Sequence, residues 1–416
     1  MAIEVRGIVE DEAETFMRSV FWAFHEGPTP EAMDDELTLA ETDRQVAAVD
    51  GGQVVGTAGA YTFELTVPGG AQVPVAGVTV VGVLATHRRQ GALRSMMAYQ
   101  LDDVSARGEP VAVLLASEAS IYGRFGYGVA TRIAKVAVDT TGGLPLLSEP
   151  VAGGRLRLVD PGEHSSIASP VYDRVRRHRI GELSRPDVWW TVLQRDREKW
   201  RDDASARFCV VHEDDAGTVD GYCWYRVKEG EHDDGVARSE VRIWDLAAET
   251  PEVEVALLQY LSSIDLTRSI TTWTRPVDDP WPYRLVDRRR YKVKLVHDHL
   301  YVRVLDVPAA LSARTYEAPG TLTLAVDDPF RPSAGGRFRL EVGDEGKAIC
   351  ERVGDDADGD ADVRLGATAL GSLYLGDVAP SLLATAGRLS ATDDHALHLA
   401  DRILPTLRKP YCISEF

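Results

Sequence analysis

The chain has 416 residues, 44% of them hydrophobic, and a formal net charge of −19 at pH 7. This length exceeds that of an ordinary single domain, so we expect two or three domains. The negative charge argues against nucleic acid and anionic membranes as partners, because both would repel the protein. The charge is compatible with a cationic substrate, although plain solubility is the favoured explanation.

Several further classes are disfavoured by the sequence. It contains no run of 18 apolar residues, so no membrane span is predicted. The first residues lack a basic region followed by an apolar one, which predicts no signal peptide. The cysteines lack the spacing of metal ligands, so no metal site is predicted, and they are typical of a reducing compartment: Cys209, Cys223, Cys350 and Cys412. We therefore expect a cytoplasmic protein.

The first domain is predicted to cover residues 1–140, with strands and helices interleaved. Helical spacing of apolar residues predicts a helix over 10–26. Apolar and β-branched runs, with the glycine turns between them, predict the elements that follow: strands at 45–49 and 54–58, a hairpin over 64–75, a buried strand at 78–84, a helix at 93–104, a buried strand at 111–115 and a closing strand at 133–138.

A glycine turn flanked by arginines joins the strand at 78–84 to the helix at 93–104. The residues concerned are Arg88, Arg89, Gly91 and Arg94. Backbone N–H groups at a helix N-terminus attract anions, and arginines strengthen that attraction. The arrangement suits a pyrophosphate lying over the turn, whereas the plainer alternative is a solvated helix start.

This turn resembles the acyl-CoA signature of the GNAT acetyltransferases. Arg88 and Gly91 fit that signature, whereas Leu93 stands where Gly or Ala is usual. The wider string over residues 81–94 is similar to one branch, the Eis (enhanced intracellular survival) family. Further blocks that resemble this family lie at 116–128, at 371–376 and at the last two residues, 415–416. The chain is accordingly identified as a member of the Eis family along its whole length.

The second domain is predicted to cover residues 141–295, after a stretch rich in glycine and proline at 142–154. It repeats the rhythm of the first domain, with a helix at 166–179, strands at 208–211, 221–227 and 239–246, and a helix at 253–263. The step between the last strand and helix lacks the Arg-x-x-Gly pattern, and Glu249 there would repel a pyrophosphate. We therefore expect a degenerate GNAT-like domain that does not bind CoA.

The third domain is predicted to cover residues 296–416. Its expected elements are strands at 299–305, 321–326, 336–342 and 363–365, and helices at 370–375 and 395–407. The Eis resemblance implies a sterol-carrier-protein-like α/β fold for this part. The fold class expected for the whole chain is α+β, with tandem GNAT folds, the second degenerate, followed by that domain.

The resemblance also implies acetyl-CoA as a co-substrate and suggests which residues contact it. The backbone of Val81 and Val83 would pair with the pantetheine arm. The phosphates would be held at the turn, by Arg88, Arg89, Gly91 and Arg94. Ser117 would contact the cofactor, although a serine there could equally cap a helix.

Two residues are implied to carry the chemistry. Tyr122 stands at the position of the family's general acid, although spacing alone favours a core tyrosine packed against Phe125 and Tyr127. Phe416 would supply its terminal carboxylate as the base, since desolvation can raise the pKa of such a group. The alternative for Phe416 is a frayed terminus.

Residues 24–26 align with the family's substrate cleft. Phe24 stands where an acidic residue is frequent in the family, Glu26 could supply that charge from two residues on, and His25 is either a base or a surface histidine.

The predicted function is an acetyl-CoA-dependent N-acetyltransferase. Its acceptors would be amines of polycationic small molecules such as aminoglycosides, acetylated by direct transfer in a ternary complex, since no activated Cys or Ser accompanies the motif. The alternatives are acetylation of protein lysines and a module that binds a lipid or sterol in the third domain. The family resemblance suggests a homo-oligomer, a hexamer.

Overall fold

The computed structural model describes residues 3–148, 153–230, 238–354 and 361–416. Residues 149–152, part of the expected linker, therefore lie outside the described residues. The chain forms two compact units. Unit 1 contains Met1–Thr131, His299–Pro410 and Ser414–Phe416, and unit 2 contains Arg132–Asp298 and Tyr411–Ile413.

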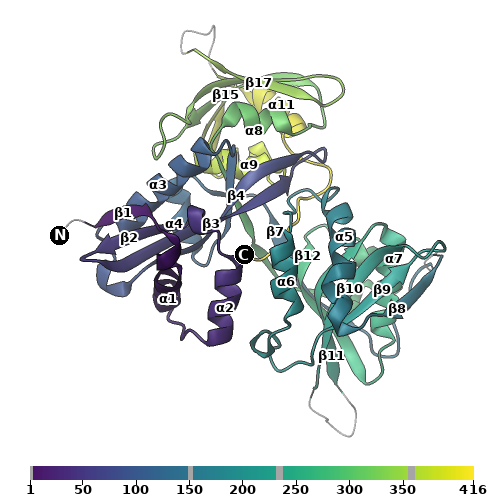
Figure 1. The fold of residues 1–416 in the computed structure, drawn as a ribbon. Coiled ribbons are helices and arrows are strands. Elements are labelled where there is room, and N and C mark those ends of the chain that lie inside the picture. The colour runs from purple at the N-terminus through teal and green to yellow at the C-terminus, as the bar shows by residue number, and fades with distance from the viewer. Residues whose placement is uncertain (1–2, 149–152, 231–237, 355–360) are drawn as a thin grey trace. The chain divides into compact units, whose positions relative to one another are not determined.

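The first sheet of unit 1 has the strand order β1-β2-β3-β4-β5-β14-β6 (Figure 1). Its strands are β1 (Glu4–Gly7), β2 (Val46–Asp50), β3 (Gln53–Thr66), β4 (Gln72–Val83), β5 (Val111–Leu115), β6 (Gly128–Val129) and β14 (Leu300–Val304). The strands β4 and β5 are parallel, and the helix between them is α3. A strand–helix–strand unit of this kind positions the residues at the end of β4 over the start of the helix.

The helices of this region are α1 (Ala13–Ala23), α2 (Pro30–Leu39), α3 (Ala92–Ala106) and α4 (Ala119–Tyr122). Figure 1 shows α1 and α2 side by side, and the two helices are in contact. The sequence analysis missed α2. Its start is nevertheless encoded locally, because Thr29 accepts a hydrogen bond from the Ala32 amide at 3.2 Å and Pro30 occupies the first helical turn.

The strand β3 corrects another expectation. Two separate strands were predicted at 54–58 and 64–67, but the structure contains one 14-residue strand. Gly59, between the two predicted strands, has a packing role. A Cβ at Gly59 would lie 2.2 Å from Gln45 Oε1 and 2.9 Å from the Val80 side chain, so glycine is required for the strand to run straight through.

The sheet of unit 2 has the order β13-β7-β12-β11-β10-β9-β8. Its strands are β7 (Arg132–Asp139), β8 (Arg155–Leu158), β9 (Phe208–Glu213), β10 (Val219–Lys228), β11 (Ser239–Ala248), β12 (Thr267–Pro276) and β13 (Tyr291–Asp298), and its helices are α5 (His164–Arg176), α6 (Asp187–Gln194) and α7 (Pro251–Ser262). The strands β11 and β12 are parallel with α7 between them, as β4 and β5 are with α3.

The third sheet, in unit 1, has the order β17-β16-β15-β18-β19. It consists of β15 (Gly320–Asp327), β16 (Gly336–Val342), β17 (Ala348–Val353), β18 (Val363–Gly366) and β19 (Leu389–Ala391), with the helices α8 (Val307–Ala313), α9 (Ala367–Tyr374), α10 (Pro380–Thr385) and α11 (Asp394–Ile403). The helix α9 packs closely on the first sheet. A Cβ at Gly371 would lie 2.2 Å from the Val302 carbonyl oxygen, which explains the glycine of the 371–376 motif.

Two strands were predicted at the right residues but assigned to the wrong sheet. The strand at 133–138 was expected to close the first domain, whereas β7 pairs with β12 and β13 in the sheet of unit 2. The strand at 299–305 was expected in the third domain, whereas β14 pairs with β5 and β6 in the first sheet. Each sheet is thus completed by a strand from the far side of a domain boundary.

Within the described ranges, no helix combines the length and the apolar character that crossing a membrane requires.

Candidate active site

The strand β4 separates from its parallel neighbour in mid-course. The paired stretch ends at Val78 and Leu114, but β4 continues to Val83. The end of β4 therefore lacks the β5 ladder on one side, and an extended ligand can pair with the backbone there as an added strand. Val81 and Val83, the predicted positions for the pantetheine arm, lie in this stretch.

A β-bulge lies where the two strands separate. Thr57 pairs with Gly82 and Gly59 with Thr79, so Val80 and Val81 together oppose the single residue between Thr57 and Gly59. Val80 has φ of 46°, which is strained for a β-branched residue, and Thr57 Oγ1 donates a 2.8 Å hydrogen bond to its carbonyl oxygen. Bulges reorient a strand next to functional sites. No sequence signal points to a valine in this conformation.

The loop after β4 leads to a helix N-terminus without a side-chain cap. Gly91 is the N-cap residue of α3 and has φ of 88°. Because glycine has no side chain, it cannot cap the first amides of the helix. In the part of the chain that the structure describes, no atom would lie within 4 Å of a Cβ placed on Gly91. The first amides of an α-helix lack partners within the helix, so this end can bind an anion.

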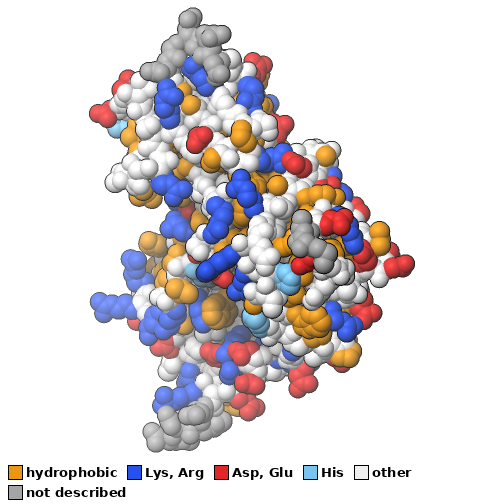
Figure 2. Space-filling view, turned by 90° about the vertical axis from the view of Figure 1, so that its left-hand side faces the viewer, with side chains coloured by type: hydrophobic (Ala, Val, Ile, Leu, Met, Phe, Trp, Pro, Cys, Tyr) orange, Lys and Arg blue, Asp and Glu red, His pale blue; other side chains and the backbone are white. Residues whose placement is uncertain are grey.

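The predicted arginines surround this helix end. Arg88, Arg89 and Arg94 are all exposed. Arg88 Nε donates to the Val83 carbonyl at 3.4 Å, and the Arg94 guanidinium lies 5.2 Å from the centre of the Phe330 ring. Figure 2 shows several Lys and Arg side chains grouped on the face that it displays, so the net charge of −19 is not spread evenly over the surface.

Tyr122 is buried at the end of α4, in the same apolar cluster as Val78, and Val81 packs against that cluster. Its ring meets Tyr127 edge-on at 6.0 Å. Burial, followed by the nearby Glu118 carboxylate, raises the pKa of Tyr122 to about 12. No hydrogen bond of the Tyr122 hydroxyl is found among the described residues, so this neutral phenol keeps its O–H available as a donor in the cluster that Val81 packs against.

Ser117 is exposed and lies just before α4. It does not cap that helix, because the N-cap residue is Glu118. The capping alternative for Ser117 is therefore wrong, whereas contact with a cofactor stays a prediction.

Residues 24–26 lie against β4 because of one glycine. A Cβ at Gly82 would lie 2.7 Å from the Ala23 Cβ atom and 3.7 Å from the Phe24 ring, so the end of α1 approaches the strand closely. Phe24, His25 and Glu26 are exposed, and His25 has φ of 61° where the chain leaves the helix. The structure thus brings the predicted substrate loop and the predicted cofactor strand together.

Phe416 lies against the same strand. Its ring meets Phe63 edge-on at 5.3 Å, and its Cε2 atom would be 3.2 Å from a Cβ placed on Gly77. The residue is half-buried, and the preceding Ser414 accepts a bond from His299 Nε2 on its carbonyl oxygen at 3.3 Å. Phe416 is therefore packed rather than frayed.

Acidic side chains accompany this end of the site. The helix α2 carries Glu31, Asp34, Asp35 and Glu36. Burial, and then the charges of Glu36 and Glu41, raise the pKa of Tyr61, whose ring lies 5.9 Å from Phe63. Because Phe63 also contacts Phe416, negative charge lies close to the aromatic group that holds the C-terminus.

The strand-to-helix connection of unit 2, from β11 to α7, differs from the one between β4 and α3 because its helix start is capped. Thr250 Oγ1 accepts from the Val253 amide at 3.3 Å, and Pro251 contributes no N–H group. Glu249 forms a 2.6 Å ion pair with Arg174. At this helix start one amide is thus capped, one position has no N–H group, and the neighbouring arginine is paired within the unit.

The interior of the third sheet offers little room for a lipid. A cavity of about 10 Å³ lies among apolar side chains, among them Leu311, Leu370 and Leu373. Drug-sized ligands occupy pockets of roughly 300–1,000 Å³. Arg314, fully buried at this cavity, donates to the carbonyl oxygens of Leu373 and Leu404, which further disfavours an apolar guest.

Family models assign the three parts of the chain. An acetyltransferase (GNAT) domain model matches residues 4–130, a second one matches residues 181–304, and a sterol carrier protein domain model matches residues 307–413. The expected order of two GNAT folds and a sterol-carrier-like domain is therefore confirmed.

The chain also aligns with relatives over most of its length. It is 42% identical to an uncharacterized N-acetyltransferase of Streptomyces coelicolor, over 94% of each chain. It is 36% identical to the N-acetyltransferase Eis of Mycobacterium tuberculosis, over 89% of each chain. The crystal structure of Eis1 from Mycobacterium abscessus superposes with a TM-score of 0.85 at 32% identity, over 99% of this chain and 100% of that one.

The fold, the separated end of β4 and the uncapped helix start define a GNAT acetyltransferase, a fold that implies acetyl-CoA as acetyl donor. More particularly, the chain belongs to the Eis family of N-acetyltransferases.

Proposed function

We propose that this enzyme acetylates amines of polycationic small molecules, such as aminoglycosides, by direct transfer from acetyl-CoA in a ternary complex. The observation that carries the proposal is the set of segments that contact β4. Val81 packs on the Tyr122 cluster, Gly82 receives the substrate loop, and Gly77 receives Phe416. The strand β4 thus adjoins the predicted acid Tyr122, the predicted base Phe416, and the predicted sites for the pantetheine arm and for the acceptor amine.

On this proposal the half-buried end of β4 pairs with the pantetheine arm through Val81 and Val83. The phosphates lie at the start of α3, held by Gly91 and by Arg88, Arg89 and Arg94, and Ser117 contacts the cofactor. An uncapped helix start with three exposed arginines favours this placement.

The neutral acceptor amine attacks the thioester carbonyl carbon, forming a C–N bond, and the C–S bond breaks. The amine loses a proton to the Phe416 carboxylate, and the departing thiolate accepts a hydrogen bond from the Tyr122 hydroxyl. The pKa of Tyr122, about 12, lies above that of a thiol, about 8.5. Tyr122 therefore acts mainly by donating a hydrogen bond to sulfur as negative charge develops.

The acidic surroundings of the site favour a cationic acceptor. Glu36 and Glu41 act on Tyr61 beside Phe63, and Glu26 follows the exposed Phe24. Negative charge raises the local concentration of a polycation. A protein lysine presents a single ammonium group at each position, so polycationic small molecules suit this charge distribution better.

The test compares three purified proteins: one with an N-terminal tag, one with a C-terminal tag, and one lacking Phe416. A C-terminal tag converts the carboxylate into an amide, and the deletion moves it back by one residue, roughly 3.3–3.6 Å of reach. We expect both changes at the C-terminus to reduce acetyl transfer strongly and to leave acetyl-CoA binding intact.

Thiol release from acetyl-CoA is measured across pH with an aminoglycoside, a monoamine and a lysine peptide. Equal rates for the two tagged proteins would remove Phe416 as the base and leave His25 or Glu26 as candidates. A preference for the lysine peptide would overturn the proposed acceptor class.

A further inference from the structure

Unit 2 contains a fully buried carboxylate that contacts the end of the chain. Glu182 lies in the segment between α5 and α6 and is 0% exposed. It receives hydrogen bonds from the Tyr172 hydroxyl at 3.1 Å and from the Leu183 amide at 3.3 Å, and it forms an ion pair with Arg179 at 3.3 Å. A buried carboxylate is costly unless it is paired and hydrogen-bonded, so this environment specifies its position closely.

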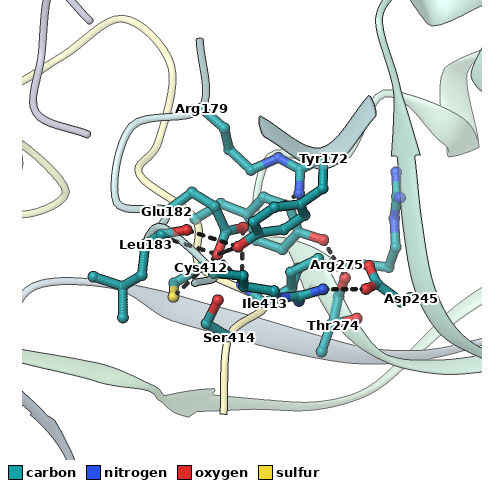
Figure 3. Close-up of polar contacts among 12 residues, drawn as sticks. Tyr172, Arg179, Glu182, Leu183, Asp245, Thr274, Arg275, Cys412, Ile413 and Ser414 are labelled. Carbon is teal, nitrogen blue, oxygen red and sulfur yellow. Dashed lines mark hydrogen bonds and ion pairs between the residues drawn. The ribbon is translucent and has the colours of Figure 1, made fainter. Parts of the chain in front are cut away.

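The remaining contacts of Glu182 are with the C-terminal segment Tyr411–Ile413. The Ile413 amide donates to Glu182 Oε2 at 3.2 Å, and Cys412 Sγ lies 3.6 Å from Oε1. Figure 3 shows Glu182 between these tail residues and the side chains of Tyr172 and Arg179. Hydrogen bonds to a charged acceptor are roughly twice as strong as neutral ones, so the carboxylate suits the task of holding a backbone amide.

Tyr411 provides a second hold on the same segment. Its amide donates to the Ile180 carbonyl at 2.7 Å, and its hydroxyl donates to the Thr274 carbonyl at 2.5 Å. The Arg179 guanidinium lies 4.9 Å from the centre of its ring. The tail is thus fixed by backbone bonds at both of its ends, Tyr411 and Ile413.

The position of this segment in the second GNAT fold is informative. The parallel strands β11 and β12 are paired up to Ile243 and Thr272 and then separate. Thr274, which accepts the Tyr411 bond, lies just beyond that point on β12. Ala247, beyond it on β11, belongs to the same apolar cluster as Tyr411 and Ile413. The tail therefore enters the opening that corresponds to the proposed pantetheine site of unit 1.

We propose that Glu182 is a positioning residue for acetyl transfer, which holds the tail at Ile413 and so limits how far Phe416 can move. Only three residues follow Ile413, and they span at most about 10–11 Å. The consequence for catalysis rests on the proposed role of the Phe416 carboxylate. The anchoring itself does not, and the experiment separates the two.

The experiment combines hydrogen exchange with kinetics on the full chain. Glu182→Gln keeps the size of the side chain and removes its charge, and Tyr411→Phe keeps the ring and removes the bond to Thr274. Exchange of the C-terminal peptide is followed by mass spectrometry, together with kcat, KM and acetyl-CoA affinity. We expect the tail amides to exchange roughly 10-fold faster or more. We expect kcat to fall about 10-fold or more at unchanged acetyl-CoA affinity, because small displacements of reacting groups are costly.

Asp196→Asn is the matched control. Asp196 is a carboxylate of unit 2 that pairs with Arg226 and accepts from the Arg207 amide. Its loss should lower the melting temperature of the protein without faster exchange of the tail or a lower kcat. A change in kcat that followed thermal stability alone across all the variants would overturn the positioning role.

Two further outcomes distinguish the proposals. Faster tail exchange with unchanged kcat would support the anchoring by Glu182 and overturn its positioning role in acetyl transfer, whereas the tagged and shortened proteins test the Phe416 carboxylate itself. Unchanged tail exchange in both Glu182→Gln and Tyr411→Phe would overturn the anchoring, whatever the activity. If Glu182→Gln does not fold, Tyr411→Phe still tests whether holding Tyr411–Ile413 positions Phe416, and unchanged kcat at faster tail exchange would then overturn the positioning role.

Discussion

The two GNAT folds of this chain differ most at the helix that follows the separating strand. The helix α3 begins at Gly91, with φ of 88°, no side-chain cap and open space around it. The helix α7 begins at Thr250, whose hydroxyl caps it, followed by Pro251. One helix end has amides available to a ligand, whereas at the other end one amide is capped by a side chain and one position has no N–H group.

The difference shows how a fold can be kept while its ligand site is lost. Both sheets retain parallel strands that separate in mid-course. In unit 2 the Glu249–Arg174 ion pair stands at the helix start, and Tyr411–Ile413 enters the strand opening. Architecture is set by the core and the strand ladders, whereas binding depends on a few residues at their ends.

The largest expected effect concerns Gly91. The substitution Gly91→Asp should abolish acetyl-CoA binding measured by calorimetry, because it adds a negative charge at the proposed phosphate site and strains a left-handed backbone. Gly91→Ala should cost about 1–2 kcal/mol from backbone strain alone, since nothing lies within 4 Å of its Cβ.

Gly108→Asp is the control for Gly91. Gly108 also has a positive φ, of 77°, and open space, but it follows the other end of α3. It should lose a similar amount of stability and keep acetyl-CoA affinity. Binding that survived Gly91→Asp would contradict the assignment of this turn to the phosphates.

The next effect concerns Tyr122. Tyr122→Phe should lower kcat by roughly 10²-fold, through loss of one donor to the developing thiolate, at unchanged acetyl-CoA affinity. Tyr127→Phe is the matched control, because the buried Tyr127 hydroxyl has no hydrogen-bond partner among the described residues and its removal should leave kcat unchanged. Equal activity of both variants would make Tyr122 a core residue only.

A smaller effect is expected at the arginines. Arg88→Ala or Arg89→Ala should each weaken acetyl-CoA binding by on the order of 1–3 kcal/mol, and less at high salt. Arg107→Ala removes the same charge after the opposite end of α3, where Arg107 pairs with Asp43 and Asp103, and should not change the affinity. Titration calorimetry at two ionic strengths measures all three variants.

The smallest effect is expected in unit 2. Thr250→Ala should cost about 1 kcal/mol of folding free energy, the usual cost of losing a helix cap, and should not change the acetyl-CoA dissociation constant. The intact enzyme should bind one acetyl-CoA per chain. A stoichiometry of two would contradict the conclusion that the second GNAT fold has lost its acetyl-CoA site.

Local patterns predicted most of the elements. The helix spacing of 93–104 and the apolar run of 111–115 correspond to α3 and β5. The helix α2 was missed because its four acidic residues leave a weak apolar stripe, although Thr29 and Pro30 mark its start. The bulge at Val80 could not be predicted, because valine disfavours positive φ and adopts it here only under the constraint of neighbouring strands.

The sequence by itself determined the family, the three-part order and the candidate residues, because these depend on motifs that are contiguous along the chain. The tertiary structure alone decided which sheet receives β7 and β14, that Gly77 and Gly82 bring Phe416 and Phe24 onto β4, and that Glu182 binds the tail. The Glu182–Ile413 contact joins residues 231 positions apart. Pairings of this kind depend on the shape of the folded chain, which no local pattern encodes.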